Sequence, residues 1–126
     1  MSKIPYGQVA AIAESVAKRF GVFECMECSI ALKREFERHG ITAVRLELVA
    51  VGVNPAKHGY IIMADEGMKL PFDHLAGAAI ATNGRHFGVQ VGDHVYDNVF
   101  RTGIKRSLWP AQFAAQGRLQ VEPLSD

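Results

Sequence analysis

The chain has 126 residues, of which 48% are hydrophobic, and 14 Lys and Arg against 13 Asp and Glu give a formal net charge of +1. This length and composition predict a single domain, over residues 1–126, with a hydrophobic core. The near-neutral charge gives no reason to expect a nucleic-acid partner, and no apolar run is long enough to cross a membrane. Without a recognisable signal peptide or disulfide framework, we expect a protein of the reducing cytoplasm, and export without a cleaved signal stays open.

Two helices are predicted first along the chain. Residues 6–20 carry apolar side chains at helical spacing, and Gly21 is a suitable stop. A second helix is predicted over 25–39, followed by Gly40 as C-cap. Its apolar stripe consists of residues four positions apart, namely Cys28, Leu32 and Phe36.

After Gly40 the hydrophobic pattern changes to the alternation that is typical of strands. The predicted elements are strands at 41–51 and 59–64, a short strand or extended segment at 79–82, a hairpin over 85–100, a short helix starting near Pro110 and an edge strand over 117–124. Residues 65–78 are less regular and contain loop signals. Helices followed by strands predict an α+β domain with an antiparallel sheet.

The hairpin over 85–100 has a tight turn at Gly92-Asp93. A turn of this length fixes the register of the strands, so that defined residues face each other. The expected pairs are Val91 with His94, Val89 with Tyr96, and Gly88 with Asp97.

This register places His86 and Asp97 on one face of the hairpin, one diagonal step apart, and Asn98 on the other face. Gly88 lies between His86 and Asp97 and has no side chain to block their contact. A longer turn would bring Asn98 to His86 instead. A His beside an Asp is typical of a catalytic base with an orienting partner, and a surface ion pair or a structural histidine is the alternative.

Both cysteines, Cys25 and Cys28, lie at the start of the second predicted helix with C-x-x-C spacing. A thiol at a helix N-terminus faces unpaired N–H groups and the positive end of the helix dipole, which favours the thiolate. Cys25 is nearer that end, whereas Cys28 lies in the apolar stripe and is the better candidate for a buried structural cysteine. Inert thiols, a redox pair and a zinc site are the alternatives. The five histidines show no zinc-ligand spacing, which argues against a zinc site. A thioredoxin-like redox pair follows a strand, whereas here a helix precedes the two cysteines.

Three segments together resemble a known family. They are FECMECSIALKREFERHGI at 23–41, NGRHFGVQVGDHVYDNVFRTGI at 83–104 and SLWPAQF at 107–113. Over about residues 21–115 the chain resembles the papain-fold toxin domains of bacterial polymorphic toxin systems. The resemblance implies a papain-like fold with Cys25 as nucleophile, His86 as base and Asp97 as orienter. It also implies a protein or peptide substrate and a dedicated immunity protein as partner.

The residues and the resemblance agree on a cysteine hydrolase, either a protease or a protein-glutamine deamidase, that needs no cofactor or metal. The segment 17–24, before Cys25, lacks the Gln that papain-like proteases use as an oxyanion donor. This motivates the alternative of a catalytically inactive papain-like scaffold that binds a protein partner.

Further residues are candidates for substrate binding or for the oxyanion site. Asn83 is a candidate hydrogen-bond donor to the oxyanion, with a simple turn residue as the alternative. Met26 is expected either to line the substrate cleft or to cover it. For Trp109 the alternatives are a wall of the cleft, a shield of the His–Asp pair from water, and an anchor of the core.

Overall fold

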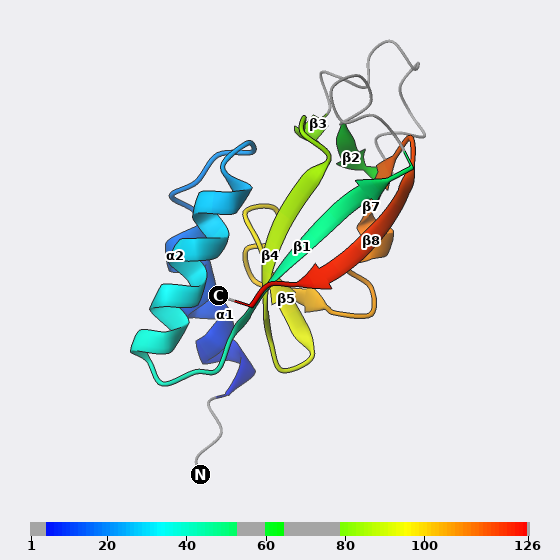
Figure 1. Cartoon of the computed structure of the whole chain (residues 1–126). Helices are drawn as coiled ribbons and strands as arrows, with labels where there is room; N and C mark the ends of the chain where they lie inside the picture. The colour runs from blue at the N-terminus through cyan, green and yellow to red at the C-terminus, as the bar shows by residue number, and fades with distance from the viewer. Residues whose placement is uncertain (1–4, 53–59, 65–78, 126) are drawn as a thin grey trace.

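The computed structural model describes residues 5–52, 60–64 and 79–125. Helix α1, Tyr6–Ala17, and helix α2, Cys25–Arg38, pack against each other and lie on one side of the larger sheet (Figure 1). Both predicted helices are confirmed, although α1 ends at Ala17 and the chain then turns. Gly40 follows α2 with φ +72°, the left-handed conformation in which glycine commonly ends a helix.

The larger sheet has five strands in the order β6-β5-β4-β1-β8, and its neighbouring strands are antiparallel. Its strands are β1 Val44–Val51, β4 Arg85–Val91, β5 His94–Tyr96, β6 Ile104–Lys105 and β8 Arg118–Pro123. The α+β class is therefore confirmed. The predicted edge position of the last strand is confirmed too, since β8 pairs with β1 at one border of the sheet.

A second sheet has the order β3-β2-β7. It consists of β2 Ile61–Met63, β3 Ala79–Ala81 and β7 Phe113–Ala115, and a 3-10 helix, η2 Pro110–Gln112, leads into β7. The predicted strands at 59–64 and 79–82 and the short helix near Pro110 are thus present. The expected loop over 65–78 lies outside the described residues.

The hairpin register agrees with the prediction in the part next to the turn. Val89 faces Tyr96, Val91 faces His94, and Gly92 adopts φ +60°. The prediction that the second strand continues to residue 100 is wrong, because β5 ends at Tyr96. Residues 97–100 form a turn instead, so the ladder does not extend to Asp97.

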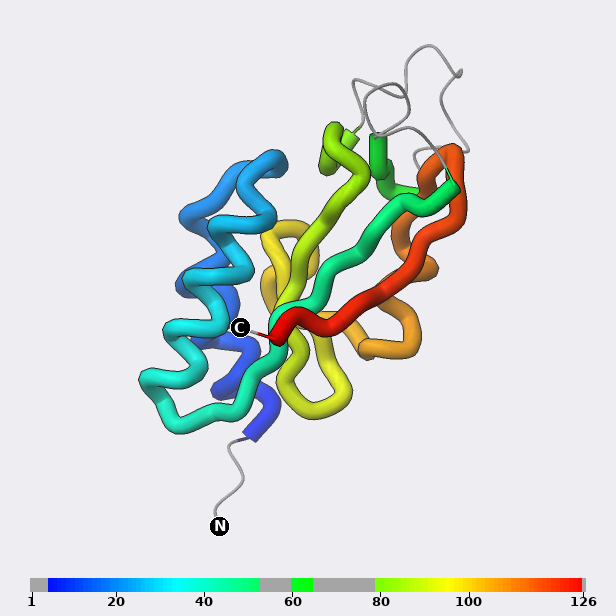
Figure 2. The backbone as a smooth tube through the Cα atoms, in the orientation of Figure 1, coloured from blue at the N-terminus to red at the C-terminus, as the bar shows by residue number. Residues whose placement is uncertain are grey.

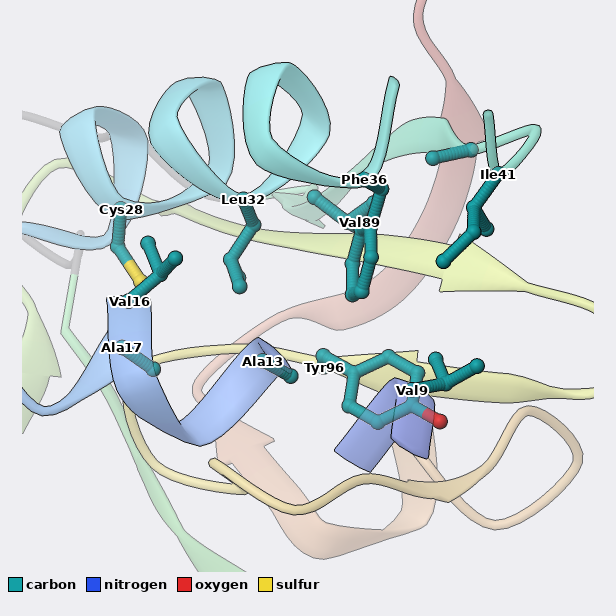
Figure 3. Close-up of a cluster of buried hydrophobic side chains, with 11 residues drawn as sticks. Val9, Ala13, Val16, Ala17, Cys28, Leu32, Phe36, Ile41, Val89 and Tyr96 are labelled. Atoms are coloured by element: carbon teal, nitrogen blue, oxygen red, sulfur yellow. The ribbon is translucent and has the colours of Figure 1, made fainter. Parts of the chain in front are cut away.

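The core is divided between the two faces of the larger sheet. On the helix side, Cys28, Leu32 and Phe36 of α2 point toward α1, and Val89 and Tyr96 come from the sheet (Figure 3). On the other face, a second cluster gathers side chains of both sheets and of the segment before η2. Its buried members are Leu46, Leu48, Ile61, Ile80, Ala81, Val95, Trp109 and Phe113.

In the part of the chain that the structure describes, no helix has the length and apolar character needed to cross a lipid bilayer.

Candidate active site

A buried histidine–aspartate pair lies at the start of β4. Nε2 of His86 is 2.8 Å from Oδ2 of Asp97, and both side chains are fully shielded from solvent. β4 carries His86, and Asp97 directly follows β5, so the hairpin brings the two residues together as predicted, although Asp97 lies in the turn after β5 and not in the ladder. An added Cβ at Gly88 of β4 would be 2.9 Å from the Trp109 ring.

The Asp97 carboxylate is surrounded by hydrogen-bond donors. Oδ1 accepts the backbone N–H of Val99 at 2.9 Å and also that of Phe100. Oδ2 accepts the indole N–H of Trp109 at 2.9 Å, besides its bond with His86. Burial alone would raise the pKa of Asp97, but the histidine and these N–H donors lower it below the ordinary value. The carboxylate is thus held in its charged form.

The neighbours of His86 raise its pKa above the ordinary value. Burial alone would lower its pKa, but the Asp97 hydrogen bond, an interaction with Cys25 and the charges of both partners raise the pKa to about 9. Because Nε2 is bound to Asp97, Nδ1 is the ring nitrogen left for another partner. Among the described residues, no group completes a hydrogen bond of regular geometry with Nδ1.

Cys25 is the first residue of α2 and lies close enough to His86 for the two side chains to interact. The exposed fraction of the whole residue is 7%. The first backbone N–H groups of a helix have no partner within the helix, and Cys25 stands among them. Figure 2 shows the turn between the helices and the start of β4 at the same end of the molecule.

Cys28 occupies a different environment, one turn further along α2. It is fully buried in the cluster between the helices and the sheet (Figure 3). Burial, and next the nearby charge of Asp97, raise the pKa of Cys28 to about 12. Both cysteines are free thiols. Cys28 is therefore a neutral packing residue at physiological pH, and Cys25 is the cysteine next to the histidine.

Two aromatic rings pack against the imidazole from the second core cluster. The ring centroid of His86 is 4.9 Å from that of Phe113 and 5.9 Å from that of Trp109. Trp109 has no exposed surface. It lies behind the His–Asp pair and covers it, and so has no surface with which to wall a substrate cleft.

A cavity of about 200 Å³ lies over the start of α2 and the start of β4. Cys25, Met26 and Asn83 line it, so two of the proposed substrate-binding residues border the same space as the thiol. The exposed side chain of Phe23 and the side chain of Arg85 also line it. Asn83 Oδ1 accepts the backbone N–H of Arg85 at 3.2 Å, as expected for a turn residue.

Phe113 was not among the sequence-based candidates, and Asn98 was considered only as an alternative partner of His86. In the structure Phe113 packs against His86 with its ring tilted, and Asn98 binds the loop that precedes Cys25. The alternation of side chains in the hairpin does point Asn98 away from Asp97, which is the one signal that separates their roles. Within the described residues, no group of three or more His, Cys, Asp or Glu side chains is placed to hold a metal ion.

Two helices on an antiparallel sheet, with a cysteine at a helix N-terminus beside a His–Asp pair, define the class as a papain-like α+β protein. The family model described as Papain fold toxin 2 matches residues 8–114, and the chain belongs to this family. Comparison with curated proteins and with solved structures gives no match.

Proposed function

We propose that the protein is a cysteine hydrolase that cleaves C–N bonds in peptide or carboxamide groups, with Cys25 as nucleophile, His86 as acid and base, and Asp97 as the orienting residue. The observation that carries the proposal is the buried His86–Asp97 bond of 2.8 Å beside Cys25. Membership of a papain-fold toxin family supports it.

In the proposed reaction, the Cys25 thiolate attacks the carbonyl carbon of the substrate amide. The oxyanion that forms is stabilised by backbone N–H groups at the start of α2. The His86 imidazolium gives its proton to the leaving nitrogen, which departs as an amine or as ammonia, and a thioester remains.

Neutral His86 then takes a proton from water, and the resulting hydroxide attacks the thioester carbonyl. The acid product leaves and the thiolate–imidazolium pair is restored. Asp97 stays ionised throughout and holds Nε2, so that Nδ1 handles the proton on the side of Cys25. The same chemistry serves peptide cleavage and deamidation of a glutamine side chain, since the two differ only in the leaving nitrogen.

The test is the rate of iodoacetamide alkylation at each cysteine as a function of pH, read by mass spectrometry, in the wild type and in His86→Gln. We expect Cys25 to react at neutral pH at least about tenfold faster than a free thiol, because the imidazolium stabilises the thiolate. The advantage should disappear in His86→Gln and after denaturation. Cys28 is the internal control, since its buried thiol should react only when the chain unfolds.

Equal, slow alkylation of both cysteines in the folded wild type would contradict the hydrolase. It would favour the alternative, an inactive papain-like scaffold that binds a protein partner. If the pair is reactive, release of ammonia and release of new amino termini from a denatured casein substrate separate the deamidase from the protease.

A further inference from the structure

Asn98 connects the loop before Cys25 with the turn that contains Asp97. Its Nδ2 group donates to the backbone carbonyls of Gly21, at 2.8 Å, and Val22, at 3.1 Å. The two carbonyls lie in the loop that leads into α2, whereas Asn98 belongs to the turn that begins at Asp97. One side chain therefore connects the approach to the nucleophile with the segment that holds the histidine.

The orientation of this amide follows from its surroundings. Both groups that face Nδ2 are carbonyls, which only accept hydrogen bonds, so the amino end must point toward them. Asn98 is 6% exposed, and its Oδ1 has no hydrogen-bond partner among the described residues. A buried acceptor without a partner carries a free-energy cost. The amide therefore makes its two bonds to the loop although its Oδ1 atom is left without a hydrogen bond.

The loop that Asn98 contacts is itself closed by hydrogen bonds. The backbone N–H of Glu24 donates to the Gly21 carbonyl at 3.1 Å, and the Gly21 N–H donates to Glu24 Oε1 at 2.7 Å. Cys25 is the next residue after this turn. A displacement of Gly21 is thus transmitted to the Cys25 sulfur with little flexible chain between them.

The segment on the other side is equally constrained. Asp97 Oδ1 accepts two backbone N–H groups, and the Asp97 N–H donates to the Phe100 carbonyl at 3.3 Å. Asn98 lies within this turn. Both ends of the connection are therefore held by hydrogen bonds of their own, and the two bonds of Asn98 link them.

We propose that Asn98 is a positioning residue that holds the start of α2, and with it the Cys25 sulfur, close enough to the imidazole for the two side chains to interact. The proposal rests on the proposed function in taking Cys25 and His86 as the reacting pair. A misplacement of about 1 Å from a distant mutation can cost on the order of a hundredfold in rate, so this contact has a large effect on reactivity.

The experiment compares Asn98→Ala and Asn98→Asp with the wild type in the same pH-dependent alkylation of Cys25. Asn98→Ala removes the donor, and we expect its rate at neutral pH to fall by roughly tenfold or more. Asn98→Asp keeps the shape but places carboxylate oxygens against two carbonyls, so its rate should fall similarly above the pKa of the new carboxyl. Protection of Cys28 from alkylation shows that each variant is folded. If Asn98→Ala proves to be unfolded, the isosteric Asn98→Asp is the variant that tests the proposal.

Gln90→Ala is the matched control. Gln90 also donates from its side-chain amide to a backbone carbonyl, that of Gly92, at 2.8 Å in the same hairpin. It should leave the alkylation profile of Cys25 unchanged. Wild-type profiles in folded Asn98 variants, together with a loss in His86→Gln, would overturn the role of Asn98 alone. No loss in His86→Gln would overturn the proposed function.

Discussion

At the scale of single residues, Asp97 and Asn98 are neighbours with opposite partners. Asp97 bonds His86, and Asn98 bonds the carbonyls of Gly21 and Val22. Side-chain alternation from the Gly-Asp turn is enough to predict which of them faces the histidine. The partner of Asn98 could not be predicted, because it lies 76 to 77 positions away in a loop without periodicity.

The four donors around Asp97 lead to a prediction for Asp97→Asn. An amide has one carbonyl oxygen, so in either orientation its NH₂ group must face at least one N–H group that can only donate, that of Trp109 or those of Val99 and Phe100. We expect the free energy of unfolding to fall by about 2–4 kcal/mol, since charge-assisted bonds are lost and buried groups are left unpaired. The pKa of His86 should fall below about 9, because its main favourable interactions are those with Asp97. Urea unfolding and NMR titration of the imidazole measure both effects.

Asp93→Asn is the control for this substitution. Asp93 also binds a histidine, since its Oδ1 lies 2.8 Å from Nδ1 of His94, but it is exposed at the hairpin turn. Its replacement should change the stability little, because solvent screens exposed pairs. An equal loss of stability in the two variants would mean that burial of Asp97 has no special importance.

At the scale of helices and strands, the periodicity of apolar residues was sufficient to predict the longer elements. Both helices, β1, β4 and the tight turn follow from patterns of apolar residues and from glycine positions. Strands β6 and β7 were not predicted, because neither short segment stands out by an alternating pattern. β7 forms through a distant partner, since it pairs with β2, about fifty positions earlier in the chain.

Gly88 in β4 is packed so closely that it leaves no room for a side chain. A Cβ at this position would lie 2.8 Å from Cγ1 of Val95 and 2.9 Å from the Trp109 ring, so Gly88→Ala overpacks the cluster beneath His86. We expect a loss of about 1–3 kcal/mol in the free energy of unfolding, measured in urea. Gly7→Ala in α1 is the control, since no atom lies within 4 Å of its added Cβ and alanine favours the helix. A neutral Gly88→Ala would mean that the Trp109 ring moves at no cost.

At the scale of the whole molecule, the site is built from segments that meet only in the folded chain. Cys25 comes from α2, His86 from β4, Asp97 from the turn after β5, and Trp109 from the approach to η2. The residue types and the hairpin register indicated the His–Asp pair. The closeness of Cys25 to that pair followed from the family resemblance, because no local pattern relates a helix start to a strand so far along the sequence.

The titration of the pair predicts how stability depends on pH. The folded-state pKa of His86, about 9, lies above the ordinary 6.5, so its stabilisation is complete below about pH 6.5 and is lost as the pH rises through 9. The amount is at most on the order of 3 kcal/mol. Asp97 has a lowered pKa, so its contribution is present above the ordinary carboxyl range and is lost as the pH falls through the folded value.

The measurement is the urea-unfolding free energy of the wild type and of His86→Gln from about pH 5 to about pH 10. The difference between them should shrink between about pH 6.5 and pH 9. Cys28, whose pKa is raised to about 12, destabilises both chains alike at alkaline pH and cancels in the difference. A constant difference across this range would mean that folding does not change the pKa of His86.

The packing of His86 on Trp109 and Phe113 also makes the candidate site depend on the order of synthesis. Cys25 and His86 both precede the two rings in the sequence, so translation produces the pair before the side chains that cover the imidazole. A nascent chain that stops before Trp109 has the cysteine and the histidine but lacks the indole that binds Asp97. Such a chain cannot form the full arrangement of His86, Asp97 and Trp109, which requires every segment up to Trp109 to have been synthesised.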